Sequence, residues 1–310
     1  MGALEKALES GRFAVTAEMA PPKGADFSHQ LEVAETRLKG VVHAVNVTDM
    51  QGACLKASSI GLCIKLKQAG IEPIIQMTGR DRSRMAIMGD FLAAASFGID
   101  TMLAVTGDHT TIGDCKESKP VFDLDSVGIL RMLTRMEETG CDCGGNEIAG
   151  EVPKFYKGAS VTPVYEPIFL QINKLRQKAD AGAKYIQTQG LFSIEALKRF
   201  MDEVDRANIN VHIMAGIIPL KAAGMAKFMN ANIPGIDVPE PMIKRLADAA
   251  AEGKETGVKG LPAKAGTEMA AEMIAQIKDE KLCDGVHIMA IGAESSVPVI
   301  LEKAGVSINS

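Results

Sequence analysis

The chain has 310 residues, of which 46% are hydrophobic and 24% charged. These are ordinary values for a folded globular protein, and they exclude a disordered or collagen-like chain. Aromatic residues make up only 4%, Trp is absent and the formal net charge is −5. Because nucleic-acid-binding proteins use aromatic stacking platforms or basic surfaces, this composition disfavours that class.

The N-terminal segment and the cysteines indicate a cytoplasmic protein. Residues 1–13 contain two Glu and one Lys and lack the apolar core of a signal peptide. No run of 18 apolar residues is present, so we expect no transmembrane helix and no membrane partner. A chain of this length buries a large core without disulfides. We therefore expect the six cysteines, which are Cys54, Cys63, Cys115, Cys141, Cys143 and Cys283, to be reduced thiols.

Metal-binding spacing is weak in this sequence. The five His show no zinc-ligand spacing and no Cys-x-x-Cys occurs, so we expect no metal site. Cys141 and Cys143 form one Cys-x-Cys pair in the segment TGCDCGGNE. We interpret the pair as a loop feature, with a shared metal or iron–sulfur site as the alternative.

Eight short apolar runs alternate along the chain with longer helical patterns. The runs are residues 13–17, 42–47, 72–77, 101–105, 158–161, 185–188, 210–214 and 285–290. Each run is nearly continuously apolar, as is typical of parallel strands that are buried on both faces.

Helical patterns follow the predicted strands. They cover residues 28–38, 55–69, 82–97, 125–139, 168–181, 193–207, 220–231 and 294–304, and further helical stretches at 241–252 and 266–278 precede the last strand. A Gly follows four of these patterns, at Gly70, Gly98, Gly182 and Gly305. Glycine is favoured there because a helix often ends in a left-handed residue.

Eight strands that alternate with eight helices predict an α/β fold, a (β/α)8 TIM barrel, over residues 1–310 as a single domain. The alternative is an open doubly wound sheet. Such a sheet usually shows a glycine-rich fingerprint after its first strand, and the segment TAEMAPPKG lacks one. No linker or change in composition divides the chain.

Active sites of such barrels lie at the C-terminal ends of the strands. Glu18 follows the first predicted strand and is flanked by Ala17 and Met19. An acid at the mouth of an apolar barrel loses hydration, which favours the protonated form that a general acid needs. A structural carboxylate bonded to a neighbouring loop is the alternative.

Two further strand-end segments are candidates. Asp108 follows Gly107 after the fourth strand, where glycine allows a ligand to approach the backbone, although a turn aspartate is equally typical of this position. The segment TGRDRSR, residues 78–84, carries three Arg around a helix start. These side chains are typical of a phosphate or carboxylate clamp or of a solvated helix face.

Taken together, the strand-end motifs resemble the 5,10-methylenetetrahydrofolate reductase family. The resemblance is carried by VTAEMAPPKG, AVNVTD, EPIIQMTGRDRSR, LAVTGD, LRQKADAGAKYIQTQ and AGIIPL, in the family's order and spacing across nearly the whole chain. It implies a TIM barrel with a flavin, usually FAD, across the C-terminal face of the strands. It also implies a catalytic barrel of the bacterial kind, without the regulatory domain of the eukaryotic forms.

The resemblance implies a role for each matching residue. Glu18 would be the general acid that protonates the departing ring nitrogen of the folate, and Asp108 would lie between the flavin and the pterin. Gln189 would bind the pterin edge. The flavin-binding residues would be Thr48, Gln76, Thr106, Gly107 and Asp108 around the ring system, Thr162 and Glu166 along the nucleotide, and Lys178 at the phosphates.

Several positions depart from the better-known bacterial form. Gln76 stands in place of His, Thr106 in place of Arg, and Gln177 in place of a basic residue. Gly190 and Leu191 replace aromatic residues, and Met225 and Met229 replace the Gln and Phe that contact substrate and nicotinamide. These departures leave FMN open as the flavin. They also leave open an acetogen-like enzyme that takes electrons from an iron–sulfur or flavin partner subunit rather than from NAD(P)H.

Two other interpretations compete with flavin-dependent folate reduction. One is a flavin-free barrel lyase or aldolase, with AGIIPL and AIGAES as phosphate loops. It requires a Schiff-base Lys or a metal at a strand end, and neither is evident. The other is a non-enzymatic folate- or corrinoid-binding barrel. We expect a cytoplasmic oxidoreductase in an oligomer or complex.

Overall fold

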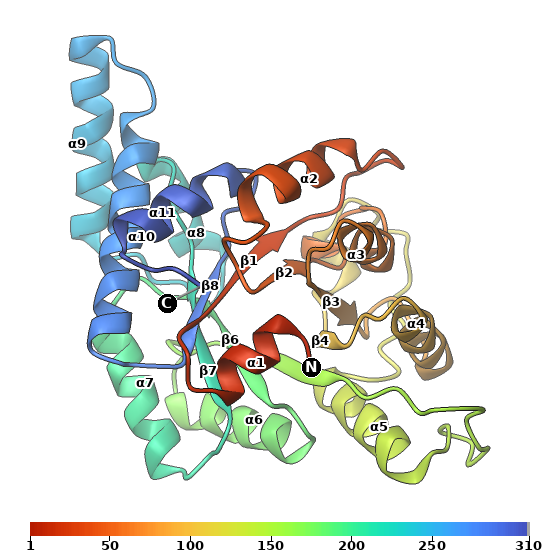
Figure 1. Ribbon diagram of the computed structural model, residues 1–310. Helices are drawn as coiled ribbons and strands as arrows, with labels where there is room; N and C mark the ends of the chain where they lie inside the picture. Colours follow the sequence, from red (N-terminus) through yellow and green to blue (C-terminus); the bar gives the residue numbers. More distant parts are fainter. Residues whose placement is uncertain (309–310) are drawn as a thin grey trace.

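In residues 1–308, which the computed structural model describes, eight parallel strands close into a barrel (Figure 1). The strands are β1 (Ala14–Met19), β2 (Ala44–Val47), β3 (Pro73–Thr78), β4 (Thr101–Val105), β5 (Tyr156–Val161), β6 (Tyr185–Gly190), β7 (His212–Ile217) and β8 (Gly285–Ile288). Each strand pairs with the next, and β8 pairs with β1. The predicted (β/α)8 barrel is confirmed, and closure rules out the open sheet.

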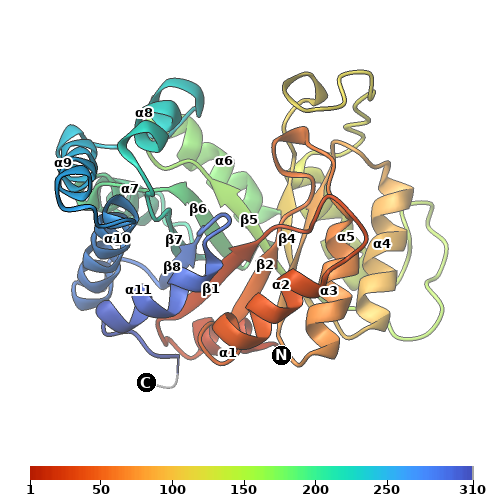
Figure 2. The same cartoon turned by 90° about the horizontal axis from the view of Figure 1, so that it is seen from above.

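Helices surround the barrel and join its strands. They are α1 (Ala3–Glu9), α2 (Ser28–Val33), α3 (Ser59–Gln68), α4 (Arg84–Ser96), α5 (Ser126–Thr139), α6 (Ile168–Asp180), α7 (Ile194–Arg206), α8 (Ala223–Asn232), α9 (Glu240–Thr256), α10 (Leu261–Asp279) and α11 (Val297–Lys303). A π-helical turn, Ala34–Leu38, continues α2. Figure 2 shows α1 at one end of the barrel and α8 at the other. None of these helices is both long enough and apolar enough to cross a membrane.

The sequence explains where several helices begin. Ser83, Asp125 and Ser193 each cap a helix, since their side chains accept hydrogen bonds from Ala86 N, Gly128 N and Ala196 N. By contrast, the pattern over residues 55–69 predicts a helix that begins four residues early. Leu55 N donates to Asp114 Oδ1 and Ala57 N donates to Pro22 O, so neighbouring loops hold this segment outside the helix.

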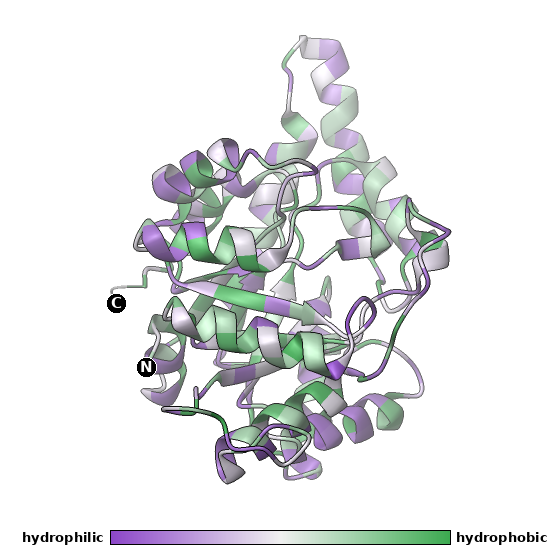
Figure 3. Ribbon diagram, turned by 90° about the vertical axis from the view of Figure 1, so that its right-hand side faces the viewer, coloured by the Kyte–Doolittle hydropathy of each residue, from purple (hydrophilic) through white to green (hydrophobic). Residues whose placement is uncertain are grey.

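The core consists of an outer layer between strands and helices and an inner layer within the barrel. The outer layer is a continuous apolar cluster that includes Val45, Ile75, Leu130, Ile186 and Phe200. The strands thus have hydrophobic residues on both sides, whereas the helices around them carry both hydrophilic and hydrophobic residues (Figure 3). This arrangement explains why the strands appear in the sequence as nearly continuous apolar runs.

Two helices, α9 and α10, form an antiparallel hairpin that projects from the barrel wall (Figures 1 and 3). A separate cluster packs its base against α8 and the end of β7, with Leu220, Met229, Leu246 and Met269 among its members. Both helices are longer than predicted. Their outer turns are exposed and carry little apolar periodicity, so the sequence pattern did not reveal them. The hairpin therefore lengthens the connection between β7 and β8 without altering the barrel.

Helix α1, which is not among the predicted helices, closes the N-terminal end of the barrel. Leu4 and Leu8 are fully buried against an interior cluster that includes Tyr185 and Met214. Glu9 Oε1 accepts a hydrogen bond from Tyr156 Oη at 3.2 Å. These contacts place α1 beneath the barrel, opposite the end where catalytic residues are expected.

A histidine joins α1 to the barrel floor in a pH-dependent way. His212 Nε2 lies 3.7 Å from Glu9 Oε1, and Nδ1 lies 3.1 Å from Asp284 Oδ1. The hydrogen bond to Asp284 raises the pKa of His212 above its usual value, against the opposing effect of burial. The protonated side chain is therefore bound more tightly in the folded state than in the unfolded chain.

We expect the free energy of unfolding to depend on pH through His212. Because its folded-state pKa is raised, this contribution is complete below the unfolded value of about 6.5 and is lost as pH rises through the folded-state pKa. We expect the free energy of unfolding, measured with urea, to decrease less between about pH 6 and about pH 8 in His212→Gln than in the wild-type protein. His29→Gln, at an exposed position on α2, is the control. Equal pH dependence in wild type and His212→Gln would contradict this assignment.

Candidate functional site

The C-terminal ends of the strands surround a pocket of about 170 Å³. Four of the residues predicted for the site line it, namely Glu18, Gln76, Thr162 and Gln189. The pocket is rich in carboxamides, which come from β2, the loop after β2, β3 and β6: Asn46, Gln51, Gln76, Gln187 and Gln189. Carboxamides both donate and accept hydrogen bonds, so the lining suits a ligand with a mixed donor and acceptor edge.

Glu18 is buried at the mouth of the barrel, with 7% of its surface exposed. Its carboxylate oxygens lie 3.5 Å from Gln51 Nε2, 3.5 Å from Gln76 Nε2 and 3.6 Å from His287 Nε2. These are long contacts, as is common for catalytic groups before a ligand binds. No Lys or Arg in residues 1–308 forms an ion pair with Glu18, so this acid is buried without a permanent cationic partner.

A buried polar layer lies directly beneath Glu18. Asn46 Nδ2 donates to Gln187 Oε1 at 2.7 Å, and Gln187 Nε2 donates to Thr16 Oγ1 at 3.2 Å. Thr16 Oγ1 lies 2.9 Å from His287 Nδ1. All four residues are at most 2% exposed. Aliphatic side chains usually fill such a barrel layer, and a polar one contributes less to stability, so its presence points to a role in the site.

The roles of His287 and Asn46 were not predicted from the sequence. Gln187 falls within the motif LRQKADAGAKYIQTQ, where the sequence assigns it no role of its own. Thr16 and Glu18 are two residues apart on β1 and therefore share a face. Thr16 is the Cα partner of His287, and Glu18 is the partner of Asn46. The available signal was a polar residue at alternate positions inside apolar strands, and it acquires meaning only once strand register is known.

The arginine-rich segment after β3 holds strand-end loops together. Arg82 donates to the fully buried Asp49 carboxylate through Nη1 at 2.6 Å and Nη2 at 3.2 Å, and its Nε donates to Asp90. The Asp49 carboxylate also accepts from the Thr78 N–H and hydroxyl, each at 2.9 Å. Burial acts to lower the pKa of Arg82, but Coulomb attraction to Asp49 and the hydrogen bonds that Arg82 donates to Asp49 and Asp90 outweigh it, so the pKa is raised.

The other two arginines of this segment are also paired within the protein. Arg80 is 2% exposed and donates to both carboxylate oxygens of Asp81 as well as to the carbonyl oxygen of Asp108. Arg84 is bound to Asp123 on the surface. The sequence left open a ligand clamp or a solvated helix face for this segment. In the structure, all three arginines instead form ion pairs with aspartates of the protein.

The loop after β4 places its predicted residues at the rim of the site, outside the lined pocket. Thr106 Oγ1 accepts from Ser126 N at 3.1 Å, so this hydroxyl faces the start of α5. Gly107 has φ +92°, and a Cβ there would lie 3.0 Å from Arg80 Cβ. Glycine is required by this conformation and by the close approach. Asp108 is exposed, and its carboxylate has no hydrogen bond or ion pair with any described residue.

Three further predicted residues lie near the strand ends. Thr48 is buried, and its hydroxyl has no hydrogen-bond partner among the described atoms. Lys178 on α6 donates to the carbonyl oxygen of Ser160 on β5. Burial, reinforced by Lys174, lowers the pKa of Lys178 to about 8. Glu166 is exposed, accepts from Ile168 N at 3.0 Å and pairs with Arg199 at 2.7 Å.

The two methionines predicted to contact substrate lie on α8. Met229 is 4% exposed within the cluster at the base of the hairpin, and Met225 is partly buried against the same cluster. Their packing is that of core residues one helical turn apart. Neither of them lines the pocket at the strand ends among the residues described.

Neither cysteines nor acidic groups assemble a metal site in residues 1–308, where no three His, Cys, Asp or Glu side chains converge. Cys141 and Cys143 lie in a loop organised by Asp142, whose carboxylate accepts from Gly144 N and Asn146 N. All six cysteines are free thiols.

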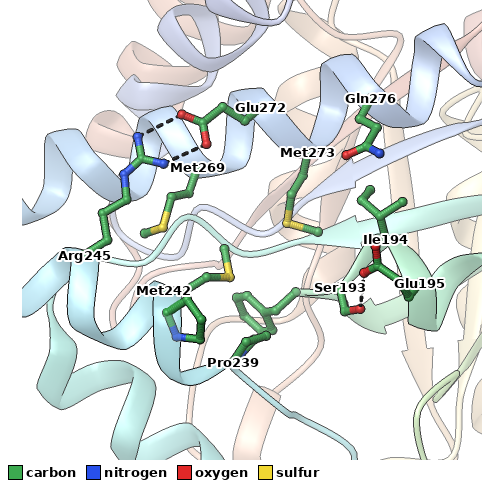
Figure 4. Close-up of a pocket in the computed structure, with 12 residues that line it drawn as sticks. Ser193, Ile194, Glu195, Pro239, Met242, Arg245, Met269, Glu272, Met273 and Gln276 are labelled. Atoms are coloured by element: carbon green, nitrogen blue, oxygen red, sulfur yellow. Dashed lines mark hydrogen bonds and ion pairs between the residues drawn. The ribbon is translucent and has the colours of Figure 1, made fainter.

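A wider hollow of about 390 Å³ lies on the outer wall, between the start of α7 and the α9–α10 hairpin. Figure 4 shows Met242, Met269 and Met273 pointing into it, with the Arg245–Glu272 ion pair at its edge. It is separate from the strand-end pocket, with which it shares no lining residue. We place the candidate active site in the strand-end pocket, because it contains Glu18 and lies where barrel enzymes have their active sites.

A (β/α)8 barrel with a buried acid and a carboxamide-lined pocket at its strand ends has the features of a barrel enzyme active site. The sequence model of the family described as methylenetetrahydrofolate reductase matches residues 3–305. The chain belongs to the methylenetetrahydrofolate reductase family.

Relatives in several organisms carry that name. Methylenetetrahydrofolate reductase 2 of Schizosaccharomyces pombe is 28% identical over 218 residues, which cover 68% of this chain and 32% of that protein. The 5,10-methylenetetrahydrofolate reductase of Buchnera aphidicola is 27% identical over 210 residues, covering 66% of this chain and 64% of that protein. A Caenorhabditis elegans protein named probable methylenetetrahydrofolate reductase (NADPH) is 22% identical over 244 residues, which cover 77% of this chain and 33% of that protein. The matches span about a third of the eukaryotic relatives.

Solved structures share the fold. A Clostridium thermocellum protein described as binding two copies of 5-methyl-5,6,7,8-tetrahydrofolic acid superposes with a TM-score of 0.64 at 15% identity, covering 98% of this chain and 99% of that one. The EDTA monooxygenase of Chelativorans gives a TM-score of 0.54 at 11% identity, covering 96% and 99%. At these identities the likeness concerns the fold alone.

Proposed function

We propose that this protein reduces 5,10-methylenetetrahydrofolate to 5-methyltetrahydrofolate with a bound flavin. The observation that carries the proposal is Glu18, an acid buried at the barrel mouth without a Lys or Arg partner among the described residues and close to Gln51, Gln76 and His287. Family membership supports the substrate class. A folate ligand is also supported by the Clostridium thermocellum protein of the same fold, which is described as binding 5-methyl-5,6,7,8-tetrahydrofolic acid.

The chemistry requires a proton at a defined atom. In the substrate, a carbon bridges two nitrogens of a five-membered ring, and one carbon–nitrogen bond must break before that carbon is reduced. Glu18 donates a proton to the departing nitrogen, and the other nitrogen forms an iminium with the bridging carbon. Addition of a hydride to that carbon then yields the methyl group. General-acid assistance of this kind is worth about 100-fold or more.

The residues at the strand ends fit a flavin. Lys178 is a half-buried cation that forms no ion pair with any described residue, and burial lowers its pKa to about 8, so a phosphate would supply the missing negative charge. The Thr48 hydroxyl and Asn46 Oδ1 are buried polar atoms without partners. Bound flavin supplies the hydride. FAD is the cofactor we propose, and FMN would use the same phosphate contact.

Lys178 predicts a pH dependence of flavin affinity. Binding of a phosphate requires the charged amine, so above the free-protein pKa of about 8 each complex must take up a proton. We expect FAD affinity to fall by up to about tenfold per pH unit above that value, and Lys178→Met to remove most of this dependence. Fluorescence titration at about pH 7 and about pH 9 measures it, with Lys254→Met, at an exposed position on α9, as the control. A wild-type affinity that is independent of pH would contradict the contact.

The remaining assignments are part of the same proposal. Asp108 and Gln189 would contact the pterin, while Thr106, Gly107, Thr162 and Glu166 would lie along the flavin. Met225, which is only partly buried, would border the substrate face, and Met229 would support it from the buried cluster at the base of the hairpin. The electron donor would be NAD(P)H or an iron–sulfur or flavin partner subunit, in a cytoplasmic oligomer or complex. A steady-state assay with each donor distinguishes these sources.

Purified protein reconstituted with FAD tests the proposal. It should show flavin absorbance that bleaches anaerobically when 5-methyltetrahydrofolate is added, because the reaction then runs in reverse. Protein that retains no added FAD or FMN, or flavin that stays oxidised with the folate bound, would overturn the proposed function.

A further inference from the structure

We propose that His287 is a positioning residue that presents a neutral Nε2–H donor to Glu18, in a tautomer set by a hydrogen-bond chain across the barrel. The proposal rests on the proposed role of Glu18 as the general acid. It assigns to His287, Thr16 and Gln187 a joint task, which is to hold the acid side chain and to stabilise the carboxylate left after proton donation.

The four side chains of the chain come from four strands. Asn46 lies on β2, Gln187 on β6, Thr16 on β1 and His287 on β8. Their contacts run from Asn46 to Gln187 at 2.7 Å, to Thr16 at 3.2 Å and to His287 at 2.9 Å. His287 Nε2 then lies 3.6 Å from Glu18 Oε2. The chain thus ends at the proposed acid.

The direction of the chain determines where His287 carries its proton. Gln187 accepts from Asn46 through Oε1, so its Nε2 group donates to Thr16 Oγ1. The Thr16 hydroxyl has one proton to donate, and His287 Nδ1 is the acceptor within reach. With Nδ1 accepting, neutral His287 carries its proton on Nε2, on the side that faces Glu18.

A neutral donor suits a general acid better than a cation does. An ion pair would hold Glu18 as a carboxylate, whereas a neutral N–H contact stabilises the carboxylate only moderately. The amides of Gln51 and Gln76 act in the same sense from the other side. Of the described residues that line the pocket, only Glu18 and His287 carry titratable side chains, and the residues paired with His287 on β1 and β7 are Thr16 and Gly216.

Nitrogen NMR of the ring tests the tautomer in the intact holoenzyme. The resonances of His287, assigned by comparison with His287→Asn or through the backbone, should show an unprotonated Nδ1 and a protonated Nε2. A protonated Nδ1 would mean that the chain runs in the opposite direction, and it would overturn the proposal. This measurement does not depend on catalysis, so its result stands even if the proposed function fails.

Two matched substitutions test the positioning role. In His287→Gln the new amide lies near the former Nε2 and keeps a donor for Glu18, whereas in His287→Asn it lies near the former Nδ1 and keeps only the contact to Thr16. Loss of the donor disfavours the carboxylate. The pH midpoint of folate reduction in His287→Asn should therefore rise by about one unit. Its maximal rate should fall about tenfold.

The readouts separate positioning from a structural role. His287→Gln should keep a pH midpoint near that of the wild-type enzyme. Thr16→Val should shift the midpoint in the same direction as His287→Asn. Thr16→Ser keeps the hydroxyl and should keep the wild-type midpoint. Flavin reduction by the donor should be unchanged throughout. Midpoints in His287→Asn and Thr16→Val equal to the wild-type value would overturn the proposal. If Glu18→Gln leaves folate reduction intact, the proposed function fails instead.

Discussion

Glu18→Gln is expected to slow reduction of 5,10-methylenetetrahydrofolate by about 100-fold or more. The substitution keeps the size of the side chain and one oxygen that can accept from Gln51 or Gln76, but it removes the proton that must reach the departing ring nitrogen. Glu18 is the only acid among the described residues that line the pocket at the strand ends, so no other carboxyl group there can replace it. Stopped-flow measurement of reduced-flavin reoxidation by the folate reports this step directly.

The other half-reaction provides the internal control for Glu18. Reduction of the flavin by its electron donor involves no ring opening, so Glu18→Gln should leave that rate nearly unchanged. Glu35→Gln, which removes an exposed carboxylate on the turn after α2, should behave as the wild type in both half-reactions. Equal losses in both half-reactions of Glu18→Gln would show that the residue acts on structure or flavin binding.

Asp49→Asn is expected to lower the free energy of unfolding by about 3 kcal/mol, because it leaves the Arg82 charge buried without its main partner. The Asp49 side chain has no exposed surface, and it joins the end of β2 to Thr78 of β3 and to Arg82 beyond it. The remaining Asp90 contact is partly exposed and compensates incompletely. Urea unfolding followed by circular dichroism measures the loss.

A matched surface pair provides the comparison for Asp49. Asp123 binds Arg84 at 2.7 Å near the start of α4, and this pair is much more exposed to water. Arg84 holds the pKa of Asp123 down at about 2. Solvent screens such pairs, so Asp123→Asn should change stability little at neutral pH. Similar losses in the two variants would show that burial of the Asp49–Arg82 pair is not what matters.

The barrel was predictable because its signals are local. Residues 101–105 predicted β4 with the observed bounds, and Asp125 and Ser193 mark the starts of α5 and α7 as side-chain caps. Helix α1 carried no comparable signal, since its seven residues become helical through packing of Leu4 and Leu8 under the barrel. The segment before α3 is likewise positioned by partners distant in sequence.

The site was predictable in part. The apolar flanks of Glu18 and its place at a strand end single it out, and the family resemblance adds Gln76, Thr162 and Gln189, which line the same pocket. His287 was not evident, because its meaning depends on closure of β8 against β1 and on the side-chain direction that this register imposes. The arginines of residues 78–84 could not be assigned, since Asp49, Asp90 and Asp123 lie elsewhere in the sequence.

Single-turnover reaction of the reduced holoenzyme with 5,10-methylenetetrahydrofolate tests the central claim most directly. Anaerobic protein with photoreduced FAD, mixed with the folate in the absence of any other electron donor or acceptor, should regain oxidised-flavin absorbance. It should form one 5-methyltetrahydrofolate for each flavin oxidised, and Glu18→Gln should show the same end point at a much lower rate. Flavin that stays reduced while the folate is bound, or reoxidation without methylated product, would contradict the account.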